Sequence, residues 1–367
     1  MTEGERFRGY IVERRIGKGS YGAVYKVRHE VMDTPFALKV LDPAVADGNP
    51  EYVKRFVREA KLASRLHHPT LVAVHDAGYD DGHGLYYIVM DYVQGGTLRE
   101  AIALGGAMDD KEAVRIIGQV ASALDAAGAL GVVHRDVKPE NIILTSDGAV
   151  KLIDLGVAKV SREIDSVKTM ANTVFGTPGY MSPEQAADSS TVDTRSDVYS
   201  LGVVFYEMLC GRSPYASKST ERIVLELLSA DPIPDVRTFN SKVSVKLSAV
   251  LMLMCAKRVE DRMKSPGELL ATLRRLGYDV PEPVAHGCNL AASGDDEPFS
   301  YNVPLADCGG DAMTFDTKDE EIQAFVKGLR RKRFRTKALL ALAVAVAAAT
   351  IAAIVLYVAL FSHKIML

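Results

Sequence analysis

Apolar residues recur with two different periods in the N-terminal and central parts of the chain. Near the N-terminus they alternate with polar residues at Tyr10 and Val12 and again around Val24, and residues 36–41 are rich in β-formers, so strands are predicted here. Further along, apolar residues recur at helical spacing in residues 51–66, 113–124, 201–209 and 247–254. Strands followed by helices predict an α+β fold, in which a small β-rich lobe with one helix precedes a larger helical lobe.

The pattern changes after residue 276. Residues 277–321 contain several prolines and glycines and many acidic residues, with Lys318 as the only Lys or Arg, which predicts a flexible acidic linker. Residues 322–337 place apolar residues on one helical face and then carry a basic cluster. We interpret residues 322–337 as a basic juxtamembrane segment.

Residues 338–361 form an uncharged run that is long enough to cross a bilayer core of about 30 Å. A buried core helix is the alternative, but the length, the lack of charge and the basic border favour a transmembrane helix. The positive-inside rule then predicts a single-pass protein of the cytoplasmic (inner) membrane, with residues 362–367 as a short external tail. The alanines between Ala341 and Ala349 would let two such helices pack closely, which leaves a homodimer open.

Composition and charge add few constraints. The net charge of −3 gives no indication of nucleic-acid binding, and the basic cluster at residues 330–337 is better explained by membrane lipid with anionic headgroups. The four cysteines lack a CxxC spacing, so neither a disulfide nor a zinc site is predicted. The N-terminus has no apolar stretch typical of a cleaved secretory signal.

Residues 134–141, with the sequence HRDVKPEN, combine a carboxylate, an ammonium group and an amide in one short loop. This combination suits phosphoryl transfer. Asp136 would accept the proton of an acceptor hydroxyl, Lys138 would neutralise charge on the transferred group, and Asn141 would bind a magnesium ion. The motif resembles the catalytic loop of protein kinases, and a lysine two residues after the aspartate is the form found in serine/threonine kinases.

A glycine-rich segment near the N-terminus fits the kinase pattern GxGxxGxV. Its residues are Ile16, Gly17, Gly19, Ser20, Gly22 and Val24. In the resemblance this hairpin covers the phosphates of ATP, because glycines without a Cβ let the backbone approach closely. Alone, the pattern is equally compatible with a plain glycine hairpin or a dinucleotide-binding turn, but no helix follows the last glycine, which argues against that turn.

Lys39 lies in the middle of the β-rich run, where an unpaired ammonium group would be costly to bury. The resemblance supplies two kinds of partner, namely the α- and β-phosphates of ATP and a glutamate on the following helix. Glu59, in the helix predicted at residues 51–66, is the candidate. The alternative is that Glu59 is one of several solvated charges on that helix.

A second metal ligand is predicted downstream of the catalytic loop. The strand predicted at residues 150–153 ends in Asp154-Leu155-Gly156, and a carboxylate at this place can bind magnesium between the phosphates. The family usually has phenylalanine at the position of Leu155. Leucine fills the same apolar position, so the difference concerns how an inactive state is held rather than metal binding.

The segment from Asp154 to Glu184 resembles an activation segment, and its Ser-Pro-Glu-Gln ending resembles bacterial members of the family. Thr177 resembles the threonine that bonds the catalytic aspartate and lysine in the loop that lines the acceptor peptide. A phosphate on Thr169 or Thr173 could pair with the guanidinium of Arg135, which predicts autophosphorylation. The alternative is that these hydroxyls only solvate a loop.

The resemblance also assigns an adenine site and two structural pairs. The adenine site comprises Val24, Ala37, Ile143, Met90 at the rear, and the hinge backbone of Asp91 and Val93. Asp197 would bond the backbone of the catalytic loop, and Arg262 would form a bidentate pair with Glu184.

The resemblance spans residues 8–276 and implies a membrane-anchored serine/threonine protein kinase of the bacterial Hanks (eukaryotic-like) type, with protein substrates and with ATP and Mg²⁺ as cofactors. Two other classes stay open: a pseudokinase that binds nucleotide without turnover, and a membrane scaffold that recruits partners. Lys39, Asp136, Asn141 and Asp154 are all present, which favours an active enzyme. A kinase of small molecules is disfavoured by the peptide-binding loop around Thr177.

Overall fold

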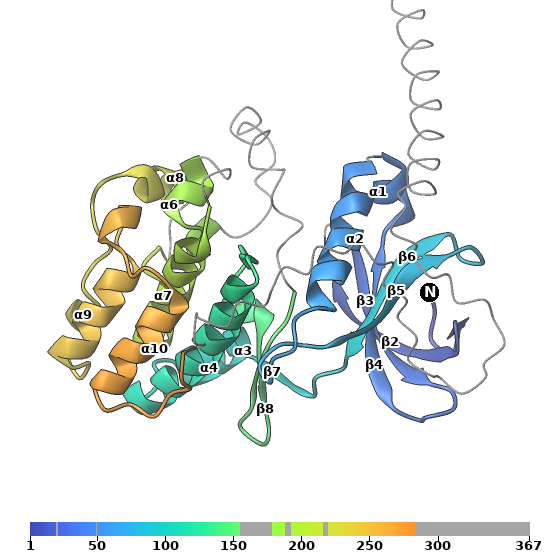
Figure 1. Cartoon of the computed structure of the whole chain (residues 1–367), viewed down its shortest axis with the longest axis horizontal. Helices are drawn as coiled ribbons and strands as arrows, with labels where there is room; N and C mark the ends of the chain where they lie inside the picture. The colour runs from blue at the N-terminus through green and yellow to red at the C-terminus, as the bar shows by residue number, and fades with distance from the viewer. Residues whose placement is uncertain (20, 49, 155–177, 188–191, 216–218, 284–367) are drawn as a thin grey trace, which may run out of the picture. The chain divides into compact units, whose positions relative to one another are not determined.

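The computed structural model describes residues 1–19, 21–48, 50–154, 178–187, 192–215 and 219–283. Residues 1–45 and 51–293 form one compact unit, and the contacts discussed below lie within it. Strands predominate in the N-terminal part of this unit and helices in its C-terminal part (Figure 1). The α+β order predicted from the hydrophobic pattern is therefore confirmed.

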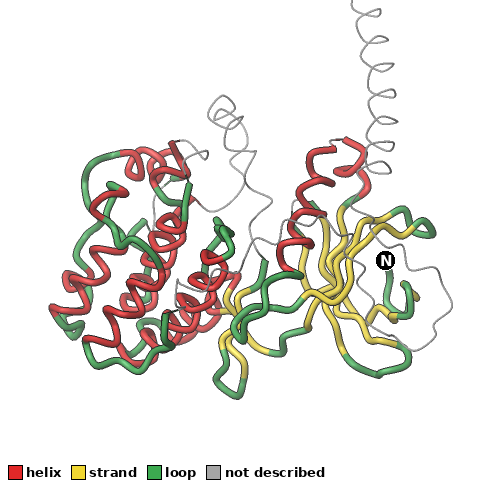
Figure 2. Tube along the Cα trace, viewed as in Figure 1, coloured by secondary structure: helices red, strands yellow, loops and turns green. Residues whose placement is uncertain are grey.

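A six-stranded sheet forms the N-terminal part (Figure 2). Its strands are β1 (Arg6–Phe7), β2 (Tyr10–Lys18), β3 (Gly22–His29), β4 (Pro35–Leu41), β5 (Val74–Asp80) and β6 (Leu85–Asp91). Their order across the sheet is β1-β2-β3-β4-β6-β5, and all neighbouring strands are antiparallel. Helices α1 (Pro43–Gly48) and α2 (Pro50–Ala63) follow β4 in the sequence.

The packing of this sheet depends on one glycine and a compact apolar core. A Cβ atom on Gly22 would lie 1.9 Å from the carbonyl oxygen of Val40, so only glycine allows the start of β3 to pair with the end of β4. The core residues that are completely buried are Phe7, Val27, Leu38 and Val89. Burying these side chains fixes the register of the strands, because a slip of one residue would expose them.

The β-rich part contains one more helix than the sequence predicted. Besides α2, the short helix α1 begins after Asp42, whose Oδ1 accepts a hydrogen bond of 2.9 Å from the backbone N–H of Ala44. Pro43 occupies the first helical position, where its missing N–H costs nothing. A helix of six residues is too short to show a hydrophobic period, which is why the pattern did not reveal it.

The C-terminal part begins with a small sheet of β7 (Gly95–Thr97), β8 (Ile142–Thr145) and β9 (Val150–Leu152). Its α-helices are α3 (Leu98–Gly105), α4 (Asp110–Ala129), α6 (Pro183–Ala187), α7 (Thr194–Cys210), α8 (Thr220–Leu228), α9 (Val245–Met254) and α10 (Pro266–Arg275). Its 3₁₀ helices are η1 (Pro139–Asn141), η3 (Pro178–Tyr180), η5 (Val236–Thr238) and η6 (Val259–Asp261).

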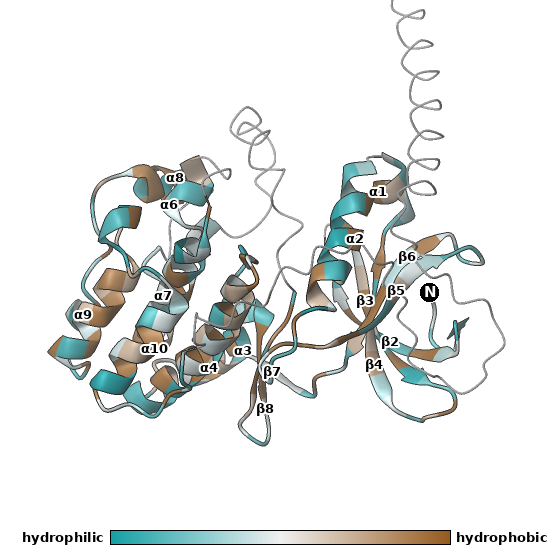
Figure 3. Ribbon diagram, in the orientation of Figure 1, coloured by the Kyte–Doolittle hydropathy of each residue, from teal (hydrophilic) through white to brown (hydrophobic). Residues whose placement is uncertain are grey.

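Helix α7 is the centre of the helical part. Every residue from Ser196 to Leu209 is buried, and α4, α9 and α10 contact it. The surrounding helices α4 and α10 are amphipathic, with hydrophobic and hydrophilic positions alternating around them (Figure 3). An apolar face on each outer helix and a fully buried central helix are what the hydrophobic effect requires of such an assembly.

The four helices predicted from apolar spacing are present as α2, α4, α7 and α9. Helices α4, α7 and α9 each begin at an N-cap residue that the spacing of apolar residues did not predict. Asp109, Asp193 and Ser244 are N-caps whose side chains accept hydrogen bonds from backbone N–H groups of the first turn. These caps extend the helices beyond the predicted apolar stretches.

Two buried residues lie outside the predicted domain limits of 8 and 276. Phe7 is completely buried in β1, and Val280 is buried against Gly118 of α4, where a Cβ would lie 2.6 Å from a methyl carbon of Val280. Arg274 donates a hydrogen bond of 3.0 Å to the carbonyl oxygen of Val280. The folded unit therefore uses residues on both sides of the predicted range.

The predicted C-terminal segments lie almost entirely outside the described residues. Only residues 277–283 of the predicted linker are described, and residues 322–337, 338–361 and 362–367 are not. Within the part of the chain that the structure describes, no helix has the length and apolar character needed to cross a membrane.

Candidate active site

The hairpin β2–β3 carries the predicted phosphate loop. The backbone N–H of Gly19 donates a 2.9 Å hydrogen bond to the carbonyl oxygen of Gly22, which closes the loop, while Gly17 pairs with Val24 across the strands. Ile16 is 38% exposed at this edge. Ser20, predicted as part of the loop, lies outside the described residues.

The predicted adenine-binding residues come from four strands and the segment after β6, and Met90 of β6 pairs with Ala37 of β4. Val24 of β3 pairs with Lys39 of β4, and Ala37 lies two residues before Lys39, so the three side chains share one face of the sheet. Ile143 lies in β8, where it pairs with Thr97. Val93 follows the end of β6.

The hinge residue Asp91 is held by a contact that the sequence did not predict. His75 of β5 and Asp91 approach to 2.6 Å between Nε2 and Oδ1, and the backbone N–H of Ala73 donates to Oδ2 at 3.2 Å. The hydrogen bond to His75 lowers the pKa of Asp91. These contacts fix the start of the hinge, and no local motif around His75 indicates them.

Lys39 binds two carboxylates. Its Nζ lies 2.7 Å from Oε1 of Glu59, so the predicted ion pair is present, and also 2.7 Å from Oδ1 of Asp154. Burial alone would favour the neutral amine, but the two carboxylates raise the pKa of Lys39, and the ammonium group in turn lowers the pKa of Asp154. Burial raises the pKa of Glu59, which the attraction of Lys39 only partly offsets because Asp154 repels a second negative charge.

The catalytic loop brings its three predicted side chains together. Lys138 Nζ lies 2.8 Å from Oδ2 of Asp136, and Asn141 Nδ2 donates to the same oxygen at 3.1 Å and to the carbonyl oxygen of Asp136 at 2.9 Å. Asn141 is buried in η1, whereas the side chain of Asp136 is 16% exposed. The carboxylate of Asp136 is thus fixed by a cation and an amide that lie within five residues of it.

Asp197 of α7 fixes the backbone of this loop, as predicted. Its two carboxylate oxygens accept hydrogen bonds of 2.8 Å from the backbone N–H groups of His134 and Arg135. Burial raises the pKa of Asp197 to about 7, although these two hydrogen bonds favour the ionised carboxylate. Arg135 has a φ of 65°, a left-handed conformation that side chains rarely adopt, and Asp197 compensates for this local strain.

Gln185 is a further loop support that the sequence did not assign. It is buried in α6, and its side-chain amide nitrogen, Nε2, donates a 3.0 Å hydrogen bond to the carbonyl oxygen of Arg135. Its Oε1 accepts from the backbone N–H of Ser182. The Ser-Pro-Glu-Gln ending of the activation segment contains this glutamine, so the motif was the signal that could have identified it.

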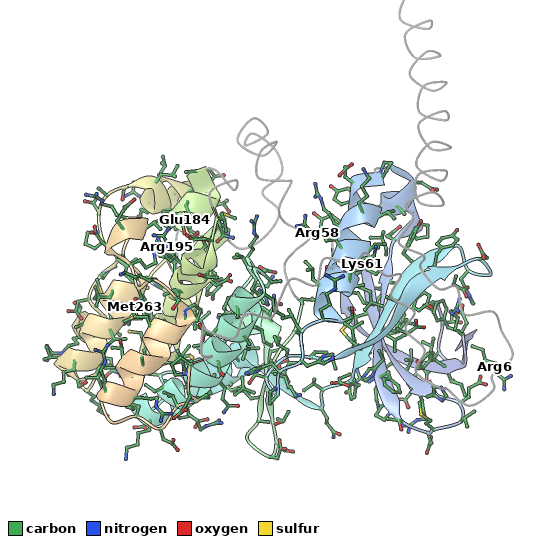
Figure 4. The ribbon with its side chains drawn as sticks, in the orientation of Figure 1. Arg6, Arg58, Lys61, Glu184, Arg195 and Met263 are labelled. Atoms are coloured by element: carbon green, nitrogen blue, oxygen red, sulfur yellow. The ribbon has the colours of Figure 1, made fainter. Side chains whose placement is uncertain are left out.

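The predicted Glu184–Arg262 pair is present and bidentate. Nη1 and Nη2 of Arg262 donate to Oε1 and Oε2 of Glu184 at 2.7 and 3.1 Å. Ser196 donates to the same carboxylate, and the carbonyl oxygen of Arg195 accepts from Nη1 of Arg262 at 2.9 Å. Glu184 and Arg195 are labelled in the side-chain view (Figure 4). This cluster ties the end of the activation segment to α7 and to the loop after η6.

Asp154 and Asn141 fit a magnesium site. The side chain of Asp154 is 40% exposed, and the amide nitrogen of Asn141 is engaged by Asp136, which leaves its amide oxygen for a cation. Magnesium is usually held by one or two protein oxygens together with substrate phosphates. Among the described residues there is no group of three or more His, Cys, Asp or Glu residues that could hold a metal ion.

The predicted activation segment is described at its two ends, Asp154 and residues 178–184. Thr177, Leu155, Thr169 and Thr173 lie outside the described residues, whereas residues 178–187, which include the end of the peptide-binding loop, are described. Asp154, the residue before the undescribed stretch, has a φ of 55°.

The family of the chain follows from comparison with known proteins. The two-part fold carries a glycine hairpin, a buried lysine–glutamate pair and a catalytic loop fixed from α7. A family model, the protein kinase domain, matches residues 10–272. The chain therefore belongs to the protein kinase family.

Among curated relatives, the serine/threonine-protein kinase PknB of Mycobacterium leprae (strain TN) is 39% identical over 268 residues, which cover 72% of this chain and 42% of that protein. The serine/threonine-protein kinase PrkC of Bacillus subtilis (strain 168) is 33% identical over 339 residues, covering 90% of this chain and 51% of that protein. The chain thus spans about half the length of these relatives or less.

A solved structure supports the fold. The crystal structure of the M. tuberculosis PknI kinase domain matches with a TM-score of 0.60 and 32% sequence identity, over 76% of this chain and 99% of that one.

Proposed function

We propose that this chain is a serine/threonine protein kinase that transfers the γ-phosphoryl group of ATP to hydroxyl groups of protein substrates. The observation that carries the proposal is the geometry around Asp136, whose carboxylate is contacted by Lys138 and Asn141 while Asp197 holds the loop backbone. The relatives PknB and PrkC, both named as serine/threonine-protein kinases, support the same class.

Each of these residues would have a separate role in phosphoryl transfer. The substrate hydroxyl oxygen forms a bond to the γ-phosphorus, the bond to the β–γ bridging oxygen breaks, and ADP leaves. Asp136 would orient the hydroxyl and accept its proton, while Lys138 would offset negative charge on the transferred group. Lys39 would bind the α- and β-phosphates. Mg²⁺, held by Asp154 and Asn141, would neutralise charge on the phosphates when bound.

The direct test compares the full chain with an Asp136→Asn variant, using Mg²⁺, γ-labelled ATP and a protein acceptor. We expect the variant to keep its fold and its ATP affinity but to lose transfer by about 10²- to 10⁴-fold, the usual contribution of a general base. Full activity in Asp136→Asn would show that the assigned role is wrong. ATP binding without transfer in the unmodified chain would instead favour a pseudokinase or a scaffold.

The proposal includes autophosphorylation of the activation segment at Thr169 or Thr173. The support is Arg135, whose Nη1 is buried and makes no hydrogen bond within the described residues. A phosphate would offer this nitrogen a strong acceptor. Mapping of the label by mass spectrometry in the same experiment would identify the sites, and label that also appeared in Asp136→Asn would point to a contaminating kinase.

We also propose that residues 338–361 anchor the chain in the cytoplasmic membrane, with the kinase domain on the cytoplasmic side and anionic lipid bound at residues 330–337. The support is the uncharged run bordered by basic residues. Removal of residues 338–367 should move the protein from the membrane fraction to the soluble fraction. A truncated protein that stays with the membrane would require another attachment. Close packing of the alanine-rich segments would give a homodimer.

A further inference from the structure

His75 is the extra residue of a β-bulge in β5, at the point where the neighbouring strand β6 leads into the hinge (Figure 1). Two pairs of residues on β5 and β6 flank it, namely Val74 with Met90 and Asp76 with Val89. Between these pairs β5 advances by two residues and β6 by one. A bulge bends its strand and changes the direction of a side chain, and bulges are common beside active sites. This bulge lies directly beside the predicted adenine site.

The imidazole of His75 completes a set of contacts around Asp91, the first hinge residue. Its Nε2 lies 2.6 Å from Oδ1 of Asp91, while Oδ2 accepts a 3.2 Å hydrogen bond from the backbone N–H of Ala73. The backbone N–H of Asp91 donates in turn to the carbonyl oxygen of Ala73 at 3.0 Å. Both the side chain and the main chain of Asp91 are therefore held by residues 73 and 75.

The imidazole ring is oriented by β4 and reaches the solvent. Phe36 of β4 pairs with Asp91 across the sheet, and its ring lies 5.1 Å from the ring of His75 at an interplanar angle of 78°. Such an edge-to-face contact fixes the plane of the imidazole. The side chain of His75 is 42% exposed and that of Asp91 is 37% exposed. The pair is therefore fixed in geometry but can exchange protons with water.

The contact between His75 and Asp91 changes in strength with protonation of the imidazole. An ionised carboxylate only accepts hydrogen bonds, so Nε2 carries a proton in both forms of the ring. A second proton, at Nδ1, turns a neutral hydrogen bond into a charge-assisted one, and imidazoles make this change between about pH 5 and 8. The hydrogen bond to His75 lowers the pKa of Asp91, as does the charge of Lys151 on β9, so the carboxylate stays ionised in this range. The next residue of β5, Asp76, accepts a 2.9 Å hydrogen bond from the hydroxyl of Tyr87.

We propose that His75 is a positioning residue of the adenine site, which holds the hinge at Asp91 more firmly when its imidazole is protonated, so that the affinity for adenine falls as the pH rises. The proposal rests on the protein kinase function proposed above, because that function places adenine against the backbone of Asp91 and Val93. A hinge that is already held in its binding geometry loses less conformational freedom when the ligand binds. Because an ion pair at a half-exposed site is weak, the expected change in affinity is about two- to fivefold.

The experiment measures the Kd of the full chain for adenosine by isothermal titration calorimetry, without Mg²⁺, at pH values between about 5 and 8. Adenosine is the probe because it carries adenine but no phosphate, whose own protonation changes in the same range. We expect the Kd of the unmodified chain to rise about two- to fivefold across the range. His75→Gln keeps a donor without a charge, and its Kd should stay near the high-pH value throughout. His75→Lys is charged throughout and should keep the low-pH value.

Two controls separate this role from a general effect on the sheet. His83→Gln removes another histidine–aspartate contact, in the turn between β5 and β6, where Nδ1 of His83 lies 2.7 Å from Oδ2 of Asp80, and it should leave the pH dependence unchanged. In an Asp91→Asn background, His75→Gln should have no further effect, because the carboxylate through which His75 acts is gone. Thermal unfolding confirms that each variant is folded.

The possible results distinguish this proposal from the proposed kinase function. A Kd for adenosine that does not change with pH in the unmodified chain, or that changes equally in His75→Gln, would overturn the role of His75. So would an effect of His75→Gln that persists in Asp91→Asn. In phosphoryl transfer, His75→Gln should raise the KM for ATP at low pH and leave kcat and the KM for the protein acceptor unchanged. Adenosine binding without transfer in the unmodified chain would count against the kinase function alone, and the calorimetric comparison would still decide the role of His75.

Discussion

Two of the buried ion clusters among the described residues, one around Lys39 and one around Arg262, differ in how completely their charges are satisfied. Arg262 is fully buried, and all three guanidinium nitrogens donate, to both oxygens of Glu184 and to backbone carbonyl groups. Lys39 instead binds two carboxylates, and that of Asp154 is 40% exposed.

This difference separates a structural pair from one that can exchange ligands. The Arg262 cluster has one cation for one carboxylate and no remaining donor, so a ligand would find nothing to bind. The Lys39 cluster has a surplus negative charge and an exposed carboxylate, which the proposed function assigns to a metal ion while Lys39 binds phosphate. Charge balance and exposure, rather than burial alone, therefore distinguish the functional site.

The largest effect on stability is expected from disrupting the Arg262 cluster. Arg262→Met would leave the carboxylate of Glu184 buried and unpaired, and we expect the free energy of unfolding to fall by about 3–5 kcal/mol. Urea unfolding followed by circular dichroism measures it. Arg258→Met is the matched control, because Arg258 is 77% exposed and its ion pairs are 3.7 Å long, and a surface pair is worth about 0–1 kcal/mol. Equal losses in the two variants would contradict the structural role of Arg262.

Disruption of the Lys39 cluster should lower activity more than stability. Lys39→Met removes the cation that would bind the phosphates, and we expect kcat/KM to fall by about 10²- to 10³-fold, as for other removed electrostatic stabilisers. Its unfolding free energy should change less than that of Arg262→Met, because Asp154 is partly exposed and Glu59, whose pKa is already raised by burial, can take up a proton. Lys54→Met, which breaks a surface pair with Glu51 on the same lobe, should retain activity. A fully active Lys39→Met would remove the basis of the comparison.

The sequence predicted the parts of this comparison that depend on local pattern. Long amphipathic stretches gave the helices, and fixed motifs gave Lys39, Asp136 and Asp154, because kinase chemistry places these residue types at set spacings. The need of Lys39 for an anionic partner followed from the cost of an unpaired buried ammonium group, whereas a glutamate on the following helix, and so Glu59, came from the family resemblance. The Glu184–Arg262 pair came from the family resemblance alone.

The remaining contacts depend on tertiary packing and had no local signal. Arg99 is an ordinary charged residue of a capped helix until α7 brings Glu207 beside it. His75 reaches Asp91 only because β5 and β6 are neighbours in the sheet. Contacts between segments far apart in the sequence appear once the fold is known, and short elements such as α1 lack the length for a period.

The finest distinction between the two clusters is the sign of their pH dependence. Burial opposes ionisation of Glu184, but its hydrogen bonds to Arg262 and Ser196 lower its pKa below the ordinary 4.5. In Glu59, burial and the neighbouring Asp154 prevail over Lys39, and the pKa is raised. The stabilising contribution of Glu184 is therefore present above pH 4.5 and is lost as the pH falls through the lowered pKa of this residue. The stabilising contribution of Glu59 is complete below pH 4.5 and is lost as the pH rises through the raised pKa of this residue.

Glu184→Gln and Glu59→Gln should therefore diverge when unfolding is measured at a series of pH values between about 2 and 8, with the change for Glu184→Gln confined to values below about 4.5. The stability deficit of Glu184→Gln relative to the unmodified chain should shrink as the pH is lowered. Glu59→Gln should instead gain relative stability as the pH is raised, because glutamine removes a carboxylate that the ligand-free site ionises only at a cost. Each variant serves as the control for the other, since general loosening of the fold would shift both in the same direction. Parallel curves would mean that the Lys39 cluster is as well satisfied as the Arg262 cluster, and that exposure of Asp154 alone separates them.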